Sequence, residues 1–242
     1  MNFHMPKPLH GWREFFHEIV IIVLGVLLAL GLEQLVSSFN NRSSAAETRS
    51  NIRSELAQNL RLLLRRQRTG DCVERRMQEI AAFLNASSRG ERPSQPTWIG
   101  APYAPLAGNA AFKSTQSAGK FILLSSSEQQ KIQAFYVDSD DFNEQSTREW
   151  YDWAQLRSLT SGARLTDTEI TRLRQALQDA RGADRLIRVD VADYAKLATL
   201  DGIVAHDHQV RPEQLTPACL PINMPYAEAS ARSAGTIPGD LQ

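Results

Sequence analysis

The amino-acid sequence predicts an all-α protein in which an N-terminal transmembrane helix leads into a long amphipathic helix and an antiparallel helical bundle with a proline-rich extended tail. Three observations predict this fold: an uncharged apolar run near the N-terminus, an apolar stripe at helical spacing after it, and two capping-box motifs further along. The stripe has the period of a helix, and the capping boxes mark helix starts. The 242 residues are enough for one domain with a hydrophobic core.

The apolar run is the strongest signal in the sequence. Its fourteen residues cover about 21 Å as a helix, and an extension over residues 15–38 is long enough to cross a membrane. Glu18 and Glu33 would then lie at the two interfaces, with Trp12 at the start of an aromatic belt. The core of the predicted span consists of Ile19, Val20, Ile21, Ile22, Val23, Leu24, Gly25, Val26, Leu27, Leu28, Ala29, Leu30, Gly31 and Leu32.

A cleaved signal peptide is the main alternative to an uncleaved anchor. Small residues around Gly31 and Ser38 suit cleavage, but Lys7 and Arg13 are offset by acidic residues such as Glu14. The sequence favours an uncleaved signal anchor and leaves cleavage open. A buried helix of a soluble protein does not suit a run that is apolar on every face.

These features predict a bacterial inner-membrane protein with a cytoplasmic tail over residues 1–14, a transmembrane helix over 15–38 and a periplasmic helical bundle over 45–210. Basic residues are nearly balanced on the two sides of the span, so the expected orientation depends on the shortness of the N-terminal tail. Gly25 and Ala29 form a small-x-x-x-small pair that favours self-association.

The segment EIVIIVLGVLLALGLEQ, residues 18–34, resembles the opening of a group of uncharacterised bacterial single-pass membrane proteins. The resemblance covers this segment, and an arginine-rich helix with a cysteine after it is a looser similarity. It implies attachment to a membrane and transfers no catalytic residue.

Apolar residues recur at helical spacing between residues 45 and 84, which predicts an amphipathic helix that continues the membrane span as one rod. Gln67, Gly70 and Asp71 interrupt this stripe, so the segment is either one long helix, which the unbroken register favours, or two joined helices. The stripe comprises Ile52, Leu56, Leu60, Leu63, Val73, Met77, Ile80 and Leu84.

Turn-forming residues divide the rest of the chain into segments. Residues 87–108 are rich in proline, glycine and serine and predict an ordered connecting loop, followed by a short helix over 109–118. Prolines recur after residue 211, so we expect residues 211–242 to run extended over the bundle.

Two capping boxes predict the starts of two more helices. One runs from Ser125 to Glu128 and opens a helix that reaches Leu156; the other runs from Thr166 to Glu169. The second helix meets Gly182, and the sequence leaves open whether it is one kinked helix or two.

Charge is balanced overall, with 27 basic and 27 acidic residues, so no net field favours nucleic acid as a partner. Locally, the helix after the membrane is basic and the helix that begins at Ser125 is acidic. We expect the basic face to be solvated or ion-paired, and we predict that the two helices pack side by side. The basic face comprises Arg61, Arg65, Arg66, Arg68, Arg75 and Arg76.

Cys72 and Cys219 are far apart in sequence and fit no metal-ligand spacing. In an oxidising compartment they could form a disulfide that closes a loop of roughly 150 residues and stabilises the fold by a few kcal/mol. In the cytosol they would be ordinary buried thiols.

Three patterns in the sequence contain residue types that can carry chemistry. His206 and His208 have no third ligand nearby, and the acidic residues 138–141 lack the glycine turn of a calcium loop. Trp150 and Trp153 share one helix face, a spacing that a bundle core uses more often than a ligand site does. The sequence therefore predicts no catalytic, cofactor-binding or metal site.

The expected function is that of an interaction or scaffold module rather than an enzyme, with no cofactor. Its expected partners are membrane lipid and either another envelope protein or a second copy of the chain. The alternative is a periplasmic ligand-sensing helical domain that signals through a partner.

Overall fold

The structure, a computed structural model, describes residues 11–205, 210–225, 227–229 and 232, without the side chains of residues 13 and 14. These residues are all-helical and contain no strand, which confirms the predicted fold class. The long elements are α1 (Trp12–Arg68), α2 (Gly70–Ser88), α3 (Ala110–Ser117), α4 (Ser126–Leu156) and α5 (Asp167–Leu200). The short elements are α6 (Pro212–Leu215) and the 3-10 turns η1 (Phe121–Leu123), η2 (Arg157–Ser161) and η3 (Pro217–Cys219).

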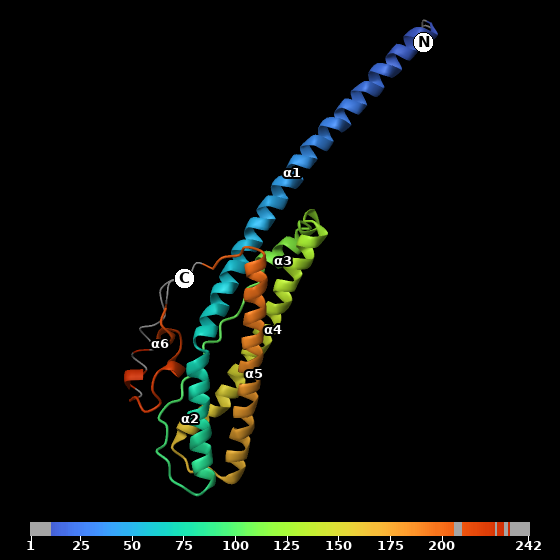
Figure 1. Ribbon diagram of the computed structural model, residues 1–242. Helices are drawn as coiled ribbons and strands as arrows, with labels where there is room; N and C mark the ends of the chain where they lie inside the picture. The colour runs from blue at the N-terminus through green and yellow to red at the C-terminus, as the bar shows by residue number, and fades with distance from the viewer. Residues whose placement is uncertain (1–10, 206–209, 226, 230–231, 233–242) are drawn as a thin grey trace, which may run out of the picture.

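α1 is a single helix of 57 residues, about 85 Å long at 1.5 Å per residue. Its first half, residues 12–43, which we call the stalk, projects alone from the bundle, and its described side chains are exposed (Figure 1). Its second half enters the core through a buried stripe that begins at Ala45 and continues with Ile52 and Leu56. The predicted continuous rod is therefore confirmed as a helix.

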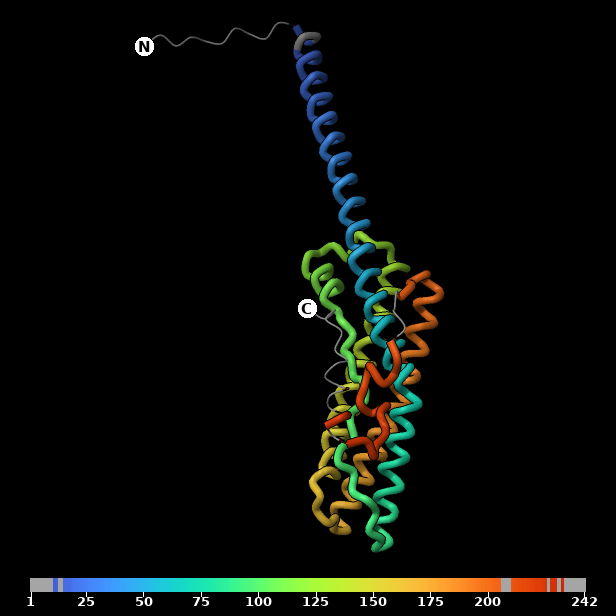
Figure 2. The backbone as a smooth tube through the Cα atoms, turned by 90° about the vertical axis from the view of Figure 1, so that its left-hand side faces the viewer, coloured from blue at the N-terminus to red at the C-terminus, as the bar shows by residue number. Residues whose placement is uncertain are grey.

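The bundle consists of the second half of α1 with α2, packed beside the antiparallel pair α4 and α5 (Figures 1 and 2). α1 and α2 are separated by Thr69 alone, so the alternative of two joined helices is correct. Leu63 and Val73, on either side of this joint, are both fully buried, which shows that the apolar register survives it.

Besides a small cluster around Trp98 and Leu220, the core has two larger clusters along the axis of the bundle. The cluster at the stalk end joins Ile52, Leu56 and Phe135 to Tyr194, and the cluster at the far end joins Val73 to Trp153 and other residues. A layer of buried charged side chains lies between the two clusters, and it is described below with the candidate sites.

Both predicted capping boxes are present. The Ser125 and Thr166 side chains accept bonds from the backbone N–H groups of Glu128 and Glu169, and the two glutamates return bonds to the cap residues. α5 then continues as one helix through Gly182, which decides between the two predicted alternatives.

α3 matches the predicted short helix and is held by side chains of α1 and α4. The Glu55 carboxylate accepts a bond of 2.7 Å from the backbone N–H of Ala111 in the first turn of α3. The amides of Asn59 and Asn143 each make two bonds to the backbone just before it, at Gly108 and Ala107 respectively. These contacts fix the end of the long loop against two helices.

The prediction that the acidic helix α4 packs mainly beside the basic helix α1 is wrong. α4 packs mainly along α5, and its contacts with α1 include the ion pairs Arg49–Glu128 and Arg66–Glu149. Apolar stripes determine which helices pair because they contribute most of the buried area, and the opposite charges are used only locally.

The prediction of an extended tail is not confirmed. Between residues 211 and 225 the chain forms α6 and η3, each with a proline in its first turn, where the fixed φ of proline suits a helical start. This segment, which we call the strap, lies beside α2 and the long loop (Figure 2).

Candidate functional site

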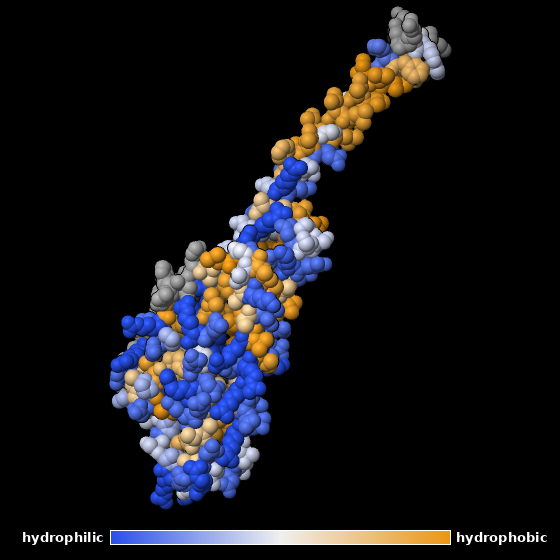
Figure 3. All heavy atoms as spheres, in the orientation of Figure 1, coloured by the Kyte–Doolittle hydropathy of each residue, from blue (hydrophilic) through white to orange (hydrophobic). Residues whose placement is uncertain are grey.

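The stalk holds all fourteen residues of the predicted span core, Ile19 to Leu32, and each of their side chains is exposed. Figure 3 shows the stalk as an apolar band that ends where the polar surface of the bundle begins. Among the described residues, this is the one helix that is long and apolar enough to cross a membrane, by length and composition. Its apolar surface has no cover within the described chain.

A buried ionic network joins three helices at the middle of the bundle. The Arg66 guanidinium on α1 donates a hydrogen bond of 2.8 Å to a Glu149 carboxylate oxygen on α4. It donates a second one, of 2.6 Å, to an Asp184 carboxylate oxygen on α5. Arg188 donates a hydrogen bond of 2.8 Å to the second Asp184 oxygen and another of 2.8 Å to the Gly70 carbonyl, at the joint between α1 and α2. Two cations thus face two carboxylates, and the network fixes the mutual register of the helices.

Glu149 is the most perturbed carboxyl of this network. Its side chain is fully buried, and one of its oxygens has no hydrogen-bond partner in the described chain. Burial raises its pKa to about 7, although the nearby Arg66 guanidinium acts in the opposite direction. Glu149 therefore exchanges its proton close to neutral pH.

The strap is attached to α2 at several points. Cys72 and Cys219 form a disulfide with their Cα atoms 4.8 Å apart. The buried Arg76 guanidinium donates to the carbonyls of Ile99 and Leu220, so one side chain ties the loop and the strap to α2. It also lies 4.7 Å from the centre of the Trp98 ring, a cation–π contact.

The long loop and the strap touch each other directly at Gly100. This glycine has φ of +73°, and a Cβ atom there would lie 2.8 Å from the backbone nitrogen of Ala218. Trp98 adds a bond of 2.7 Å from its indole N–H to the Met224 carbonyl, and the Thr216 hydroxyl donates to the Ala101 carbonyl. The far-end core is thus closed by two segments far apart in sequence.

Two arginines of the expected basic face are ion-paired, as the sequence suggested, but they are buried rather than on the surface. Arg66 and Arg76 are each 1 % exposed, although they belong to the basic face that the sequence indicated. Each lies three residues after a buried apolar residue, Leu63 and Val73 respectively, so the helical spacing already placed them on the core side.

The two tryptophans of α4 do not form a common site. Trp153 is fully buried in the far-end core, as a bundle core requires, whereas Trp150 is 46 % exposed. Tyr151 is exposed beside Trp150, with their ring centres 5.2 Å apart, and the Arg157 guanidinium lies 5.6 Å from the Trp150 ring. Exposed Trp, Tyr and Arg are the residue types that dominate binding at protein interfaces.

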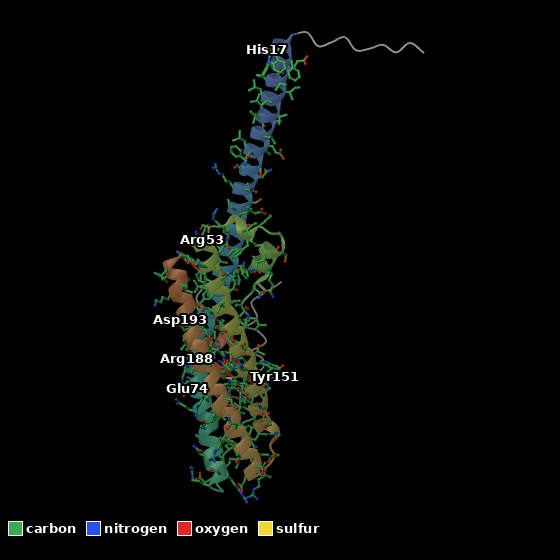
Figure 4. The ribbon with its side chains drawn as sticks, turned by 90° about the vertical axis from the view of Figure 1, so that its right-hand side faces the viewer. His17, Arg53, Glu74, Tyr151, Arg188 and Asp193 are labelled. Carbon is green, nitrogen blue, oxygen red and sulfur yellow. A yellow bond between two sulfur atoms is a disulfide. The ribbon has the colours of Figure 1, made fainter. Side chains whose placement is uncertain are left out.

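A polar cavity of about 450 Å³ lies between α2 and α5. Figure 4 shows Glu74 and Arg188 close together on this side of the bundle and Tyr151 on another side. Arginines and carboxylates line the cavity in nearly equal number, so it is close to neutral. The lining residues are Asp71, Glu74, Arg75, Gln78, Arg181, Asp184, Arg185 and Arg188.

Four aspartates lie together where α4 and α5 pack, two from each helix. Burial and the nearby Asp141, Asp138 and Asp193 raise the pKa of Asp190 to about 6. Within the described part of the chain, no group of three or more His, Cys, Asp or Glu side chains is placed to hold a metal ion. His206 and His208, for which the sequence predicts no metal site, lie outside the described residues.

Comparison with known proteins adds no family or relative. Neither a protein-family model nor a curated protein nor a solved structure matches this chain.

Proposed function

We propose that this chain is a single-pass protein of the bacterial inner membrane whose helical bundle stands in the periplasm and serves as a scaffold or interaction module. The observation that carries this proposal is the continuity of α1, which joins the exposed apolar stalk to the buried core without a break. A helix that is both anchor and core element holds the bundle at a fixed height above the bilayer.

The disulfide supports the periplasmic side. Bonds of this kind persist in oxidising compartments such as the bacterial periplasm and are rare in the cytosol. Cys72 and Cys219 anchor the strap, and the described chain has no free cysteine. An oxidised bundle favours the orientation that places it in the periplasm.

The exposed aromatic pair supports a protein partner. Trp150 and Tyr151 present rigid rings next to Arg157 on a helix that the buried Glu149 and Trp153 hold in place. Side chains on a rigid helix lose little freedom on binding. We expect a partner protein to bury this pair.

Two measurements test the proposal. A reporter that is active only in the periplasm, fused after Gln242, should be active, and the mature protein should retain its N-terminal segment by mass. Affinity capture from detergent-solubilised membranes should recover a partner that a Trp150→Ala/Tyr151→Ala variant loses and that the exposed control Gln130→Ala retains. An inactive reporter would refute the orientation, and equal capture by all variants would refute the binding surface.

A ligand-sensing role is the second candidate, and the cavity between α2 and α5 favours it. Its lining includes Arg188, which is bonded to Asp184 of the buried network, so a bound ligand would act on the helix register. Thermal stabilisation of the protein by a small charged compound, lost in Arg185→Gln, would support this function over the scaffold.

A further inference from the structure

The stalk end of the bundle carries an unusual apolar surface. Outside α1, the three most exposed large apolar side chains in the described chain are Ile122, Leu200 and Val204, which are 78 %, 73 % and 65 % exposed. Ile122 lies in η1 and Leu200 ends α5, both at the end from which the stalk emerges (Figure 1). Val204 follows in the segment that packs on α1 through Ile203.

The same end is basic although the chain as a whole is neutral. The residue ranges 42–55, 110–132 and 196–204 form this end, and they hold seven cations against four carboxylates. The cations are Arg42, Arg49, Arg53, Lys113, Lys120, Lys131 and Lys196, and the carboxylates are Glu47, Glu55, Glu128 and Asp201. Four of the five lysines of the chain are therefore gathered here.

The ion pairs at this end do not neutralise all of its positive charge. Within the described residues, Lys120 pairs with Glu47 at 3.2 Å and Lys131 pairs with Asp201 at 2.6 Å. Glu55 is already bonded to α3 and to the Tyr136 hydroxyl. The exposed cations Arg42, Lys113 and Lys196 have no carboxylate partner among these residues.

The geometry of α1 determines how far this surface lies from a bilayer. The core starts at Ala45, nine residues after Val36, which corresponds to about 14 Å along the helix. A headgroup layer takes up about 5 to 7 Å of this distance. η1 is held beside this level by the Lys120 pair with Glu47, so it lies about one Debye length, or 8 Å, beyond the headgroups.

We infer that the stalk end of the bundle docks on the anionic headgroup surface of the bilayer that holds the stalk. This inference rests on the proposed membrane anchor. A tilt of about 20°, which is the average for transmembrane helices, brings the η1 corner toward the lipid. Ile122 then approaches the headgroups, while Lys113 and Arg42, which have no carboxylate partner among the described residues, attract anionic lipid. The partner is the lipid surface itself, because a rigid helix already holds the apolar and basic side chains beside it.

The test uses the full-length protein in vesicles. An Ile122→Cys variant, labelled with an environment-sensitive fluorophore, is reconstituted in phosphatidylcholine alone or with phosphatidylglycerol, together with headgroup-located quenchers. Ser158→Cys, exposed in η2 at the far end, is the matched control. We expect quenching at position 122 to be about twofold or more greater in anionic vesicles, and to be lost near 1 M salt, where the Debye length falls to about 3 Å.

The outcomes separate the inference from the anchor. A protein that fails to float with vesicles refutes the anchor. A protein that floats but shows equal quenching at positions 122 and 158 refutes the docking, as does a signal at 122 that rises with protein density and ignores lipid charge, because that result indicates contact between copies. Lys113→Gln/Arg42→Gln should reduce the anionic effect, whereas Arg164→Gln at the far end should not.

Discussion

Arg66 and Glu149 form an ion pair of 2.8 Å between α1 and α4, and both side chains are almost completely removed from solvent. The same guanidinium reaches Asp184 on α5, so one cation joins the three long helices. Such a buried network costs desolvation energy but penalises any other helix register, since a shifted register would leave a charge unpaired.

Replacing Glu149 by glutamine should flatten the pH dependence of stability. Burial disfavours the ionised carboxylate, so the folded protein keeps a proton that the unfolded chain loses near pH 4.5, and stability falls as pH rises through about 7. We expect Glu149 to contribute about 3 kcal/mol of this fall in the native protein, and we expect this contribution to be absent in Glu149→Gln. Urea unfolding of the detergent-solubilised protein at pH 5 and pH 8 measures it.

The exposed Glu144 on the same helix provides the matched control, and Glu144→Gln should keep the native pH profile. Asp190 also titrates, near pH 6, so the informative quantity is the difference between native and variant proteins. An unchanged slope in Glu149→Gln would contradict the assignment.

Arg66→Met should strongly destabilise the fold. It leaves Glu149 and Asp184 buried with a single remaining cation, Arg188, and the loss of one partner of a buried pair costs about 3 to 5 kcal/mol. The double variant Arg66→Met/Glu149→Gln should regain part of this loss because it buries one charge fewer. If the double variant were as unstable as the sum of the single variants, the two residues would not be coupled.

The strap should depend on its disulfide. Cys72→Ser/Cys219→Ser opens a loop with a sequence separation of 147 residues, for which the chain-entropy argument gives a loss of about 3 to 5 kcal/mol. Limited proteolysis should then cut between residues 210 and 225 before it cuts the helices. The reduced native protein should give the same fragments, and protection of the strap in both samples would contradict this role.

Gly100→Ala should loosen the contact between the loop and the strap. Alanine is strained at positive φ, and its Cβ would also press against the Ala218 backbone. We therefore expect the free energy of unfolding to fall by about 2 to 4 kcal/mol. Gly90 is a close control because it also has positive φ, of 77°, but its added Cβ meets no described atom within 4 Å. Equal melting temperatures of the two alanine variants would show that the contact does not contribute.

Much of the fold could be predicted because its signals are local. The capping boxes at Ser125 and Thr166 and the short helix before Gly119 involve residues within a few positions of each other. Predictions were wrong where they depended on residues far apart in the sequence. The helical spacing of Arg66 and Arg76 from buried neighbours can be read from the sequence, but their carboxylate and carbonyl partners cannot.

The sequence by itself determined the helical class, the apolar stalk segment and the starts of the long helices, because periodicity and capping are read from neighbouring residues. Only the tertiary structure decided that α4 pairs with α5, that Cys219 of the strap meets Cys72 of α2, and that Arg66 lies between two carboxylates. The physical reason is that burial sets these pairings, and burial depends on how elements far apart in the sequence come together.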